Sequence, residues 1–204
     1  MTTYTPFAVP LPAVTLAGPF ATLEPLSAEH AEEAREAVAD GDIWQQWTTD
    51  IPAPDSVQAE IARRLELQRQ GSMLPFTVRD AAGRFAGMTS FMNIEPASLR
   101  LEIGSTWYRR DVRRTGLNTQ AKLLLLGHAF DTLGCIAVEL RTHFFNQASR
   151  AAIARLGAKQ DGVLRNHRIA RNGTLRDTVV FSILASEWPT VQAHLRWQLE
   201  RPRD

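Results

Sequence analysis

The middle of this 204-residue chain changes its hydrophobic periodicity twice within one short stretch. Apolar and polar residues alternate through residues 100–108, which predicts a strand. From Leu117 onward, apolar residues recur every three or four positions, which predicts a helix that ends at Gly134. Residues 135–142 are then almost continuously apolar, as is typical of a strand buried on both faces. The chain therefore contains a strand-helix-strand unit, which places it among the mixed α/β folds.

Further elements are predicted on both sides of this unit. Residues 1–18 are rich in proline and predict an extended arm, and the length of residues 19–204 suits a single domain. The elements expected before the unit are a strand at 21–27, helices after Ser27 and from about Asp55, and strands at 73–80 and 84–94. Those expected after it are a helix at 146–156, strands at 162–170 and 174–184, and a last helix from Ser186 to about Leu199. Asn172-Gly173 between the last two strands favours a type I′ hairpin turn.

Composition narrows the function classes. The chain has 23 Lys plus Arg against 22 Asp plus Glu, and a net charge of +1 argues against DNA or RNA binding as its main role. The longest apolar run is too short to cross a membrane, and residues 1–12 lack the pattern of a signal peptide. The single cysteine, Cys135, cannot form an internal disulfide. We therefore expect a cytoplasmic protein that binds neither DNA nor membrane, and the spacing of the five His predicts no metal site.

The loop over residues 109–116 is the strongest candidate for a binding site. It ends at the start of a predicted helix, where unpaired N–H groups and the positive end of the helix dipole suit a phosphate or pyrophosphate. Gly116 would let the backbone approach such an anion closely. The loop carries four arginines and one aspartate: Arg109, Arg110, Asp111, Arg113 and Arg114. Considered alone, these charges are better explained by solubility.

Four motifs, in order along the chain, resemble the GNAT acyltransferases and within them the RimJ/RimL-like branch, over about residues 19–199. Residues 113–118 are similar to the family's Arg/Gln-x-x-Gly-x-Gly/Ala loop, whose backbone amides bind the pyrophosphate of CoA. Residues 101–104 resemble the strand ahead of that loop, and residues 119–121 resemble its Thr-Glu-Ala. Asn146, Ser149 and residues 155–158 resemble the branch's Asn-x-x-Ser and the Leu-Gly-Phe-type turn that follows.

This resemblance implies a fold and an activity. The implied fold is a central, mostly antiparallel sheet with one β-α-β unit and flanking helices. The implied activity is transfer of an acetyl group from acetyl-CoA to a primary amine, either a protein N-terminus or a small molecule, by direct attack in a ternary complex. Ile103, through backbone N–H groups of its strand, would help to stabilise the oxyanion. The other residues implied for acetyl-CoA binding are Arg109, Arg113, Arg114, Thr115, Gly116, Leu117, Asn118, Thr119 and Asn146.

Two residues depart from the family's loop. Asn118 stands where Gly or Ala is usual; it suits a helix start but would crowd the path of the phosphates. Arg114 stands where this branch often has Gly, and its side chain would either meet the CoA phosphates or point to solvent. These departures leave open a second function, a CoA-binding module with little catalytic power. A homodimer is also left open.

Amide formation requires that a base take a proton from the amine and that the oxyanion and the leaving thiolate be stabilised. Glu102 is the candidate base, on the strand face opposite Leu101, Ile103 and Trp107, with a structural carboxylate as the alternative. Many GNAT enzymes use a tyrosine after the central strand to protonate the thiolate. The tyrosines here stand elsewhere, so Ser149 becomes the candidate acid. Asn146 would equally serve as a helix N-cap, and Ser149 as a first-turn hydroxyl.

Several other polar and aromatic residues are expected to have structural roles. Trp44, Trp47 and Phe91 would either line an acceptor pocket or belong to the core, with the core as the default, and His143 is assigned to a solvent-facing loop. The last hairpin carries Arg165, His167, Arg176 and Asp177, near where members of the GNAT family bind acceptors, and their spacing alone suggests only cross-strand pairs.

Overall fold

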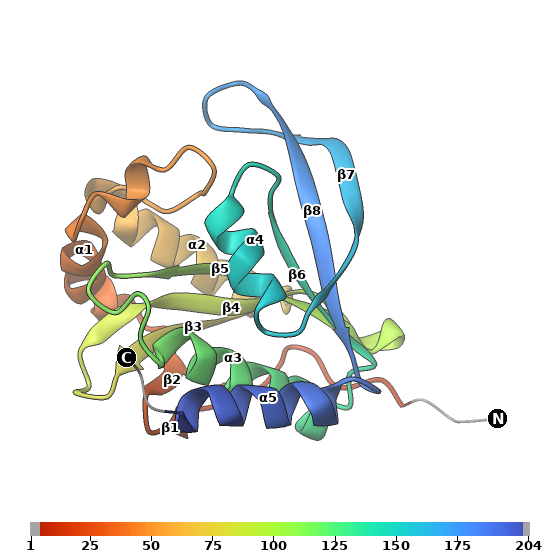
Figure 1. The fold of residues 1–204 in the computed structure, drawn as a ribbon. Coiled ribbons are helices and arrows are strands. Elements are labelled where there is room, and N and C mark those ends of the chain that lie inside the picture. Colours follow the sequence, from red (N-terminus) through yellow and green to blue (C-terminus); the bar gives the residue numbers. More distant parts are fainter. Residues whose placement is uncertain (1–4, 202–204) are drawn as a thin grey trace.

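A computed structural model describes residues 5–201, and its eight strands form one sheet with helices on both faces (Figure 1). The strands are β1 Leu16–Gly18, β2 Ala21–Pro25, β3 Met73–Asp80, β4 Phe85–Glu95, β5 Arg100–Tyr108, β6 Ala137–His143, β7 Lys159–Ile169 and β8 Leu175–Leu184. Their order in the sheet is β1-β2-β3-β4-β5-β6-β8-β7. Only β5 and β6 pair in parallel, while every other neighbouring pair is antiparallel. The predicted mixed sheet with one β-α-β unit is confirmed.

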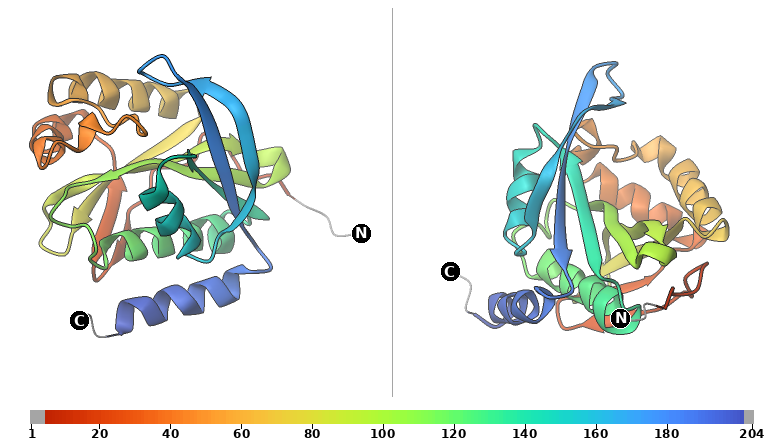
Figure 2. Two further views of the ribbon diagram at one scale, coloured as in Figure 1. Left: turned by 45° about the horizontal axis from the view of Figure 1, so that its top comes forward. Right: turned by 90° about the vertical axis from the view of Figure 1, so that its right-hand side faces the viewer.

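The sheet separates the core into two clusters, and helices cover both of them. The helices are α1 Ala31–Ala39, α2 Val57–Arg69, α3 Leu117–Gly127, α4 Gln147–Ala154 and α5 Trp188–Glu200. Apolar side chains of α1 and α2 pack in a smaller cluster on one face of the sheet, while those of α3, α4 and α5 pack in the larger cluster on the other (Figure 2). Ser27 caps the 3₁₀ turn Ala28–His30 that leads into α1, as predicted. The last helix begins at Trp188 rather than after Ser186, because Glu187 takes the N-cap position.

A β-bulge in β5 divides that strand into two parts. One residue of β4 lies between Met88 and Ser90, the partners of Trp107 and Gly104, whereas two residues of β5 lie between Gly104 and Trp107, so β5 holds one extra residue there. Ser105 takes the left-handed conformation, with φ of +49°. Leu101 and Ile103 belong to the larger cluster, whereas Trp107 belongs to the smaller one. The prediction that all three share one face is therefore wrong, because the bulge turns the end of the strand over.

The parallel pair β5 and β6 diverges soon after it forms. Ladder pairs join only Arg100 to Ala137, Leu101 to Val138 and Glu102 to Glu139. Beyond these pairs, β5 continues to Tyr108 and β6 to His143, and the described residues form no ladder pair between the two segments. This divergence leaves backbone groups on the facing edges of both strands without a β partner.

Several elements differ in extent or type from the prediction. The helix from Leu117 is α-helical only to Gly127 and continues as a π-helical turn at His128–Thr132, before Gly134 ends it with φ of +68°. The strand expected from residue 135 begins at residue 137. Residues 1–4 of the predicted arm lie outside the described residues, and residues 16–18 join the sheet as β1, which is too short for alternation to reveal. In the turn of the last hairpin, residues 170–174, only Gly173 has positive φ, so the turn is not type I′.

Candidate active site

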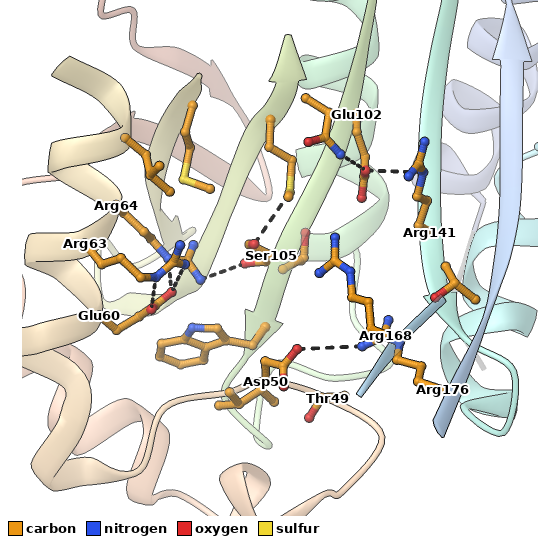
Figure 3. A pocket seen from close by; sticks show the side chains of 18 of the residues that line it. Thr49, Asp50, Glu60, Arg63, Arg64, Glu102, Ser105, Arg141, Arg168 and Arg176 are labelled. Carbon is orange, nitrogen blue, oxygen red and sulfur yellow. Dashed lines mark hydrogen bonds and ion pairs between the residues drawn. The ribbon is translucent and has the colours of Figure 1, made fainter. Parts of the chain in front are cut away.

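A cavity of about 620 Å³ lies between α2, the segment 48–51 and the β7–β8 hairpin, over strands β4, β5 and β6. We call it the central cavity. Glu102, Ser105, Thr106 and Trp107 of β5 line it. Figure 3 shows side chains from α2, the sheet and the hairpin gathered around this space. The cavity thus lies over the sheet where β5 and β6 begin to separate.

Glu102 lies in the wall of the central cavity and is only 6% exposed. Its Oε2 accepts a hydrogen bond of 2.7 Å from the Asn93 side chain and lies 3.5 Å from Nε of Arg141. Burial raises the pKa of the Glu102 carboxyl, while Arg141 and Asn93 act in the opposite direction. A carboxyl group with a raised pKa, facing a cavity, is suited to accept a proton from an amine. These contacts also suit a structural carboxylate, so catalysis by Glu102 stays a prediction.

Ser149 and Asn146 lie away from Glu102. Asn146 is the N-cap of α4, and its Oδ1 accepts the backbone N–H of Ser149 at 3.0 Å. The cap that sequence reasoning considered for Asn146 is therefore present. Helix α4 lies on the opposite side of β6 from α2 (Figure 2), and Ser149 is not part of the wall of the central cavity. The catalytic role of Ser149 stays a prediction, and only the gap between β5 and β6 could connect it with Glu102.

The loop between β5 and α3 is held by polar contacts to α1 and within itself. Asp40, at the end of α1, accepts the backbone N–H groups of Arg110 and Asp111 at 3.1 and 3.4 Å. Arg109 is engaged by acidic groups, with its Nε 3.3 Å from Asp111. The Thr115 hydroxyl donates to the carbonyl of Val112 at 2.7 Å and accepts the N–H of Leu117. Thus the side chains of Arg109 and Thr115 already have partners inside the protein.

The start of α3 keeps unpaired N–H groups. Gly116 is the N-cap and supplies no side-chain cap, and the first helical hydrogen bond runs from the Gln120 N–H to the Gly116 carbonyl. The N–H groups of Asn118 and Thr119 have no acceptor among the described residues. Such a helix start fits the pyrophosphate of a CoA molecule. The Thr119 hydroxyl, however, accepts a hydrogen bond from Arg155 and is buried, which leaves its backbone N–H for an anion.

The two arginines of this loop nearest to α3 are exposed. Neither Arg113 nor Arg114 forms an ion pair with another described residue. Arg114 has φ of +63°, in the region that favours glycine, whereas Gly116 has φ of −70°, which any residue can adopt. Any need for glycine at position 116 therefore comes from close approach of a ligand and not from backbone conformation.

Lys122 is a buried amine that sequence reasoning missed. It lies on α3 and is only 5% exposed, and its Nζ donates to the Thr106 hydroxyl at 3.1 Å. Burial lowers the pKa of Lys122 to about 7. Thr106 itself lines the central cavity. A lysine on a helix is usually exposed, so its residue type argued against burial. Its neighbours Gln120 and Ala121 are also buried, but this is visible only in the structure.

The central cavity holds six arginines, of which sequence reasoning singled out only Arg176. They are Arg63, Arg64, Arg141, Arg168, Arg171 and Arg176. They come from α2, β6, β7, β8 and the turn of the last hairpin, so no local pattern in the sequence connects them.

Two aromatic assignments from the sequence are wrong. His143 is 2% exposed, its Nδ1 accepts the N–H of Phe145 at 3.1 Å, and its ring meets the edge of Trp47 with centroids 4.9 Å apart. It is therefore buried at the end of β6 and not in a solvent-facing loop. Trp47 is 51% exposed and lines a second, smaller cavity, whereas Phe91 is in the core as predicted. Of the cross-strand pairs expected on the last hairpin, Arg165 and Asp177 form one at 2.6 Å.

Among the described residues, no group of three His, Cys, Asp or Glu side chains could hold a metal ion. No helix in the described part of the chain has the length and apolar character needed to cross a membrane.

Comparison with known proteins identifies the family. Residues 21–159 match the family model described as "Acetyltransferase (GNAT) domain". The chain belongs to the GNAT acetyltransferases. The fold expected from the sequence motifs is thereby confirmed, and the loop before α3 and the β5–β6 gap are parts of a GNAT fold.

Relatives of this GNAT protein agree in fold. A GCN5-related N-acetyltransferase from Brucella melitensis is 33% identical, with a TM-score of 0.86 over 96% of this chain and 89% of that one. Mycobacterium smegmatis RimJ, in complex with CoA-disulfide, is 24% identical, with a TM-score of 0.75 over 91% and 93% of the two chains. A Bacillus subtilis protein named "Putative ribosomal N-acetyltransferase YdaF" is 31% identical over 106 residues. That match covers 52% of this chain and 57% of the relative, so the chain matches little more than half of this curated relative's length.

Proposed function

We propose that this protein transfers an acetyl group from acetyl-CoA to a primary amine by direct attack in a ternary complex. The observation that carries the proposal is the divergence of β5 and β6 after Glu102. The central cavity holds the buried Glu102 beside this gap, and the strand that follows Glu102 leads directly to the start of α3. A thioester and an amine could therefore meet at β5 from two sides.

Acetyl-CoA fits the residues that surround the start of α3. The unpaired N–H groups of Asn118 and Thr119 and the exposed side chain of Arg113 would hold its phosphates. The side chain of Arg114 would either meet them or point to solvent. A backbone N–H group of β5 at or after Ile103, on the edge that β6 leaves without a partner, would stabilise the oxyanion. The acetyl thioester supplies the electrophile and the leaving thiolate.

Glu102 would remove the proton from the amine. Asn93 and Arg141 hold its carboxyl group in place, and burial raises its pKa toward that of its substrate. An α-amino group has a pKa of roughly 7.7 to 8.0, against about 10.4 for lysine, so an α-amine needs the weaker base. Ser149 would pass a proton to the leaving thiolate from the α4 side of the gap and receive one from water, which restores its hydroxyl group.

The proposed acceptor is a protein N-terminus or a small amine. The name of the Bacillus subtilis relative supports a ribosomal protein as one such acceptor. The proposed compartment is the cytoplasm, in keeping with a single, unpaired cysteine. A homodimer stays a proposal, and the exposed apolar side chains Phe145, Ile169 and Leu175 are candidates for its contact.

Thermal unfolding and release of free thiol test the proposal together. Acetyl-CoA should raise the melting temperature, because a ligand that binds only the folded state stabilises it. Gly116→Val keeps an allowed φ but places a side chain where the anion must approach, so its affinity for acetyl-CoA should fall at least about tenfold.

Gly162→Val in β7 is the matched control, because a side chain at that position meets no atom within 4 Å. It should bind acetyl-CoA like the parent. Parental binding by Gly116→Val would show that the loop assignment is wrong. Binding of acetyl-CoA without thiol release with any amine of a broad panel would indicate a CoA-binding module instead of an enzyme.

A further inference from the structure

The central cavity is rich in positive charge, although the whole chain carries a net charge of only +1. Its wall includes six arginines and three carboxylates, those of Asp50, Glu60 and Glu102. Cationic side chains therefore outnumber anionic ones two to one. Such a cavity attracts anions, and the arginines that lack a carboxylate partner in the protein are the ones available to bind them.

Three of the arginines have carboxylate partners that hold them. Arg63 and Arg64 both contact Glu60, at 2.8 and 2.7 Å, and Arg64 also donates to the carbonyl of Ser105 at 3.1 Å. Arg141 lies between Glu139, at 2.6 Å, and Glu102. These three side chains shape the cavity, but their charges are largely compensated inside the protein.

The other three arginines have only one carboxylate partner in the described part of the chain, Asp50, and it contacts two of the three. Arg171 donates to the carbonyl of Ile51 at 3.1 Å and lies 3.5 Å from Asp50. Arg176 lies 3.7 Å from the same Asp50, and its Nε is buried without an acceptor. The side chain of Arg168 lines the cavity and forms no hydrogen bond or ion pair with another described residue. The exposed Asp50 is therefore the only carboxylate among the described residues that contacts these arginines, and it contacts two of the three.

Arg168 and Arg176 stand directly opposite each other in the β7–β8 ladder. Figure 3 shows both side chains at the cavity, on the side across from α2. Like charges at opposite positions of a ladder repel each other, and burial lowers the pKa of Arg176. An anion between them would remove this repulsion and give Arg176 the acceptor it lacks. We call these two residues the arginine pair.

We propose that the arginine pair binds an anionic group of the acceptor, a carboxylate or a phosphate, while the amine of that acceptor lies at Glu102. This inference rests on the proposed acetyl transfer and names its substrate class: amines that carry an acidic group. Guanidinium groups bind carboxylate and phosphate through paired, charge-assisted hydrogen bonds. The positive charge of Arg168 also acts on the Glu102 carboxyl group. The acidic group of the acceptor at the arginine pair and its amine at Glu102 would therefore lie in the same cavity. The volume of about 620 Å³ admits a small acidic amine or the first residues of an acidic peptide.

Acceptors that match in size but differ in charge provide the test. The peptides Ser-Asp-Glu-Ala and Ser-Asn-Gln-Ala, both amidated at the C-terminus, form one pair. Aspartate and asparagine, each with its α-carboxyl group amidated, form another. Thiol release from acetyl-CoA should show kcat/KM at least about tenfold higher for the acidic member of a pair. The peptide pair and the amino-acid pair together show whether the acid belongs to a protein N-terminus or to a small molecule.

Variants of the cavity arginines show which residues cause the preference for acidic acceptors. Arg168→Gln and Arg176→Gln should each reduce the ratio of acidic to neutral acceptor toward one, mainly by raising KM for the acidic acceptor. Arg165→Gln is the matched control, because Arg165 lies on the same strand, pairs with Asp177 and does not line the cavity. It should keep the full preference. Arg168 is exposed, so its replacement decides the question even if Arg176→Gln fails to fold.

A binding experiment separates failure of this inference from failure of the proposed function. The CoA-saturated protein should bind N-acetylated Ser-Asp-Glu-Ala at least about tenfold more tightly than N-acetylated Ser-Asn-Gln-Ala, and Arg168→Gln should abolish the difference. Equal binding of the two probes, or an unchanged difference in Arg168→Gln, overturns the inference. Selective binding without any thiol release from acetyl-CoA would support the anion site and overturn the proposed acetyl transfer.

Discussion

The loop before α3 and the central cavity differ in how their residues are distributed along the chain. The loop is one continuous segment, residues 109–116, that ends where a helix begins. The cavity collects side chains from α2, the segment 48–51 and six strands, the farthest of which are more than a hundred residues apart. A contiguous segment can display a motif, whereas a wall assembled from distant strands cannot. The comparison explains why acetyl-CoA binding is readable from sequence and acceptor binding is not.

Strand β5 lines the cavity and leads into the loop, so it joins the two regions. Replacement of Glu102 on this strand tests whether acetyl transfer takes place there. Glu102→Gln should reduce turnover by about 10²- to 10⁴-fold while acetyl-CoA still binds, since the loop before α3 is untouched. The pKa of this carboxyl is raised by burial, so the lower limb of the parental pH–rate profile should lie above pH 4.5, and Glu102→Gln should flatten it. Thiol release between about pH 5 and 9 provides the measurement.

Stability supplies the control for that experiment. An acid whose pKa is raised on folding loses stability as pH rises through the folded pKa, so near neutral pH Glu102→Gln should be at least as stable as the parent. A purely structural carboxylate would instead leave a less stable protein with near-parental turnover. Parental turnover at every pH would show that positioning alone accounts for catalysis.

Lys122 lies on α3 and contacts Thr106 of β5, and it tests how strongly burial changes a pKa between the two regions. Its pKa is lowered to about 7 from 10.5, so between these values the unfolded chain binds more protons than the folded one. The free energy of unfolding of the parent should therefore rise with pH across this window, by on the order of a few kcal/mol, and Lys122→Met should remove the rise. Urea denaturation at several pH values measures it.

The matched control for Lys122→Met is Lys159→Met. Lys159 has a side chain that is 77% exposed and pairs with Glu187. Its replacement should leave the pH dependence of unfolding unchanged. An equal pH dependence of unfolding in the parent and in Lys122→Met would contradict the lowered pKa of the buried Lys122 amine.

Arg114 tests the conformation of the loop and has the smallest expected effect. A residue other than glycine at φ of +63° is strained, so Arg114→Gly should raise the free energy of unfolding by a few tenths to about 1 kcal/mol. Its exposed side chain adds to phosphate binding only if it turns toward the ligand. We expect acetyl-CoA affinity to stay within about threefold of the parent, as measured by titration calorimetry.

Arg113→Gly is the control at the neighbouring position. Arg113 does not have positive φ, so glycine there gains no relief of strain and should lower stability. A large loss of acetyl-CoA affinity in Arg114→Gly would mean that this departure from the family's loop is itself a phosphate ligand.

Local signals in the sequence determined the elements and the family of this protein. Ser27 caps its turn, Gly134 ends its helix, and residues 113–121 carry a helix start that is recognisable because its N–H groups and charges are neighbours in the chain. The face of Glu102 was also predictable, since it lies before the bulge and follows simple alternation.

Tertiary structure alone decided the rest. The bulge at Ser105 reverses the face of Trp107, because an extra residue in one strand shows only against its partner. The low pKa of Lys122 depends on the sheet that covers it, and the burial of His143 depends on packing at the end of β6. The arginine pair becomes a pair only when β7 and β8 align. Periodicity and capping act over a few residues and are written in order along the chain, whereas burial and charge compensation depend on distances in space that only the folded protein sets.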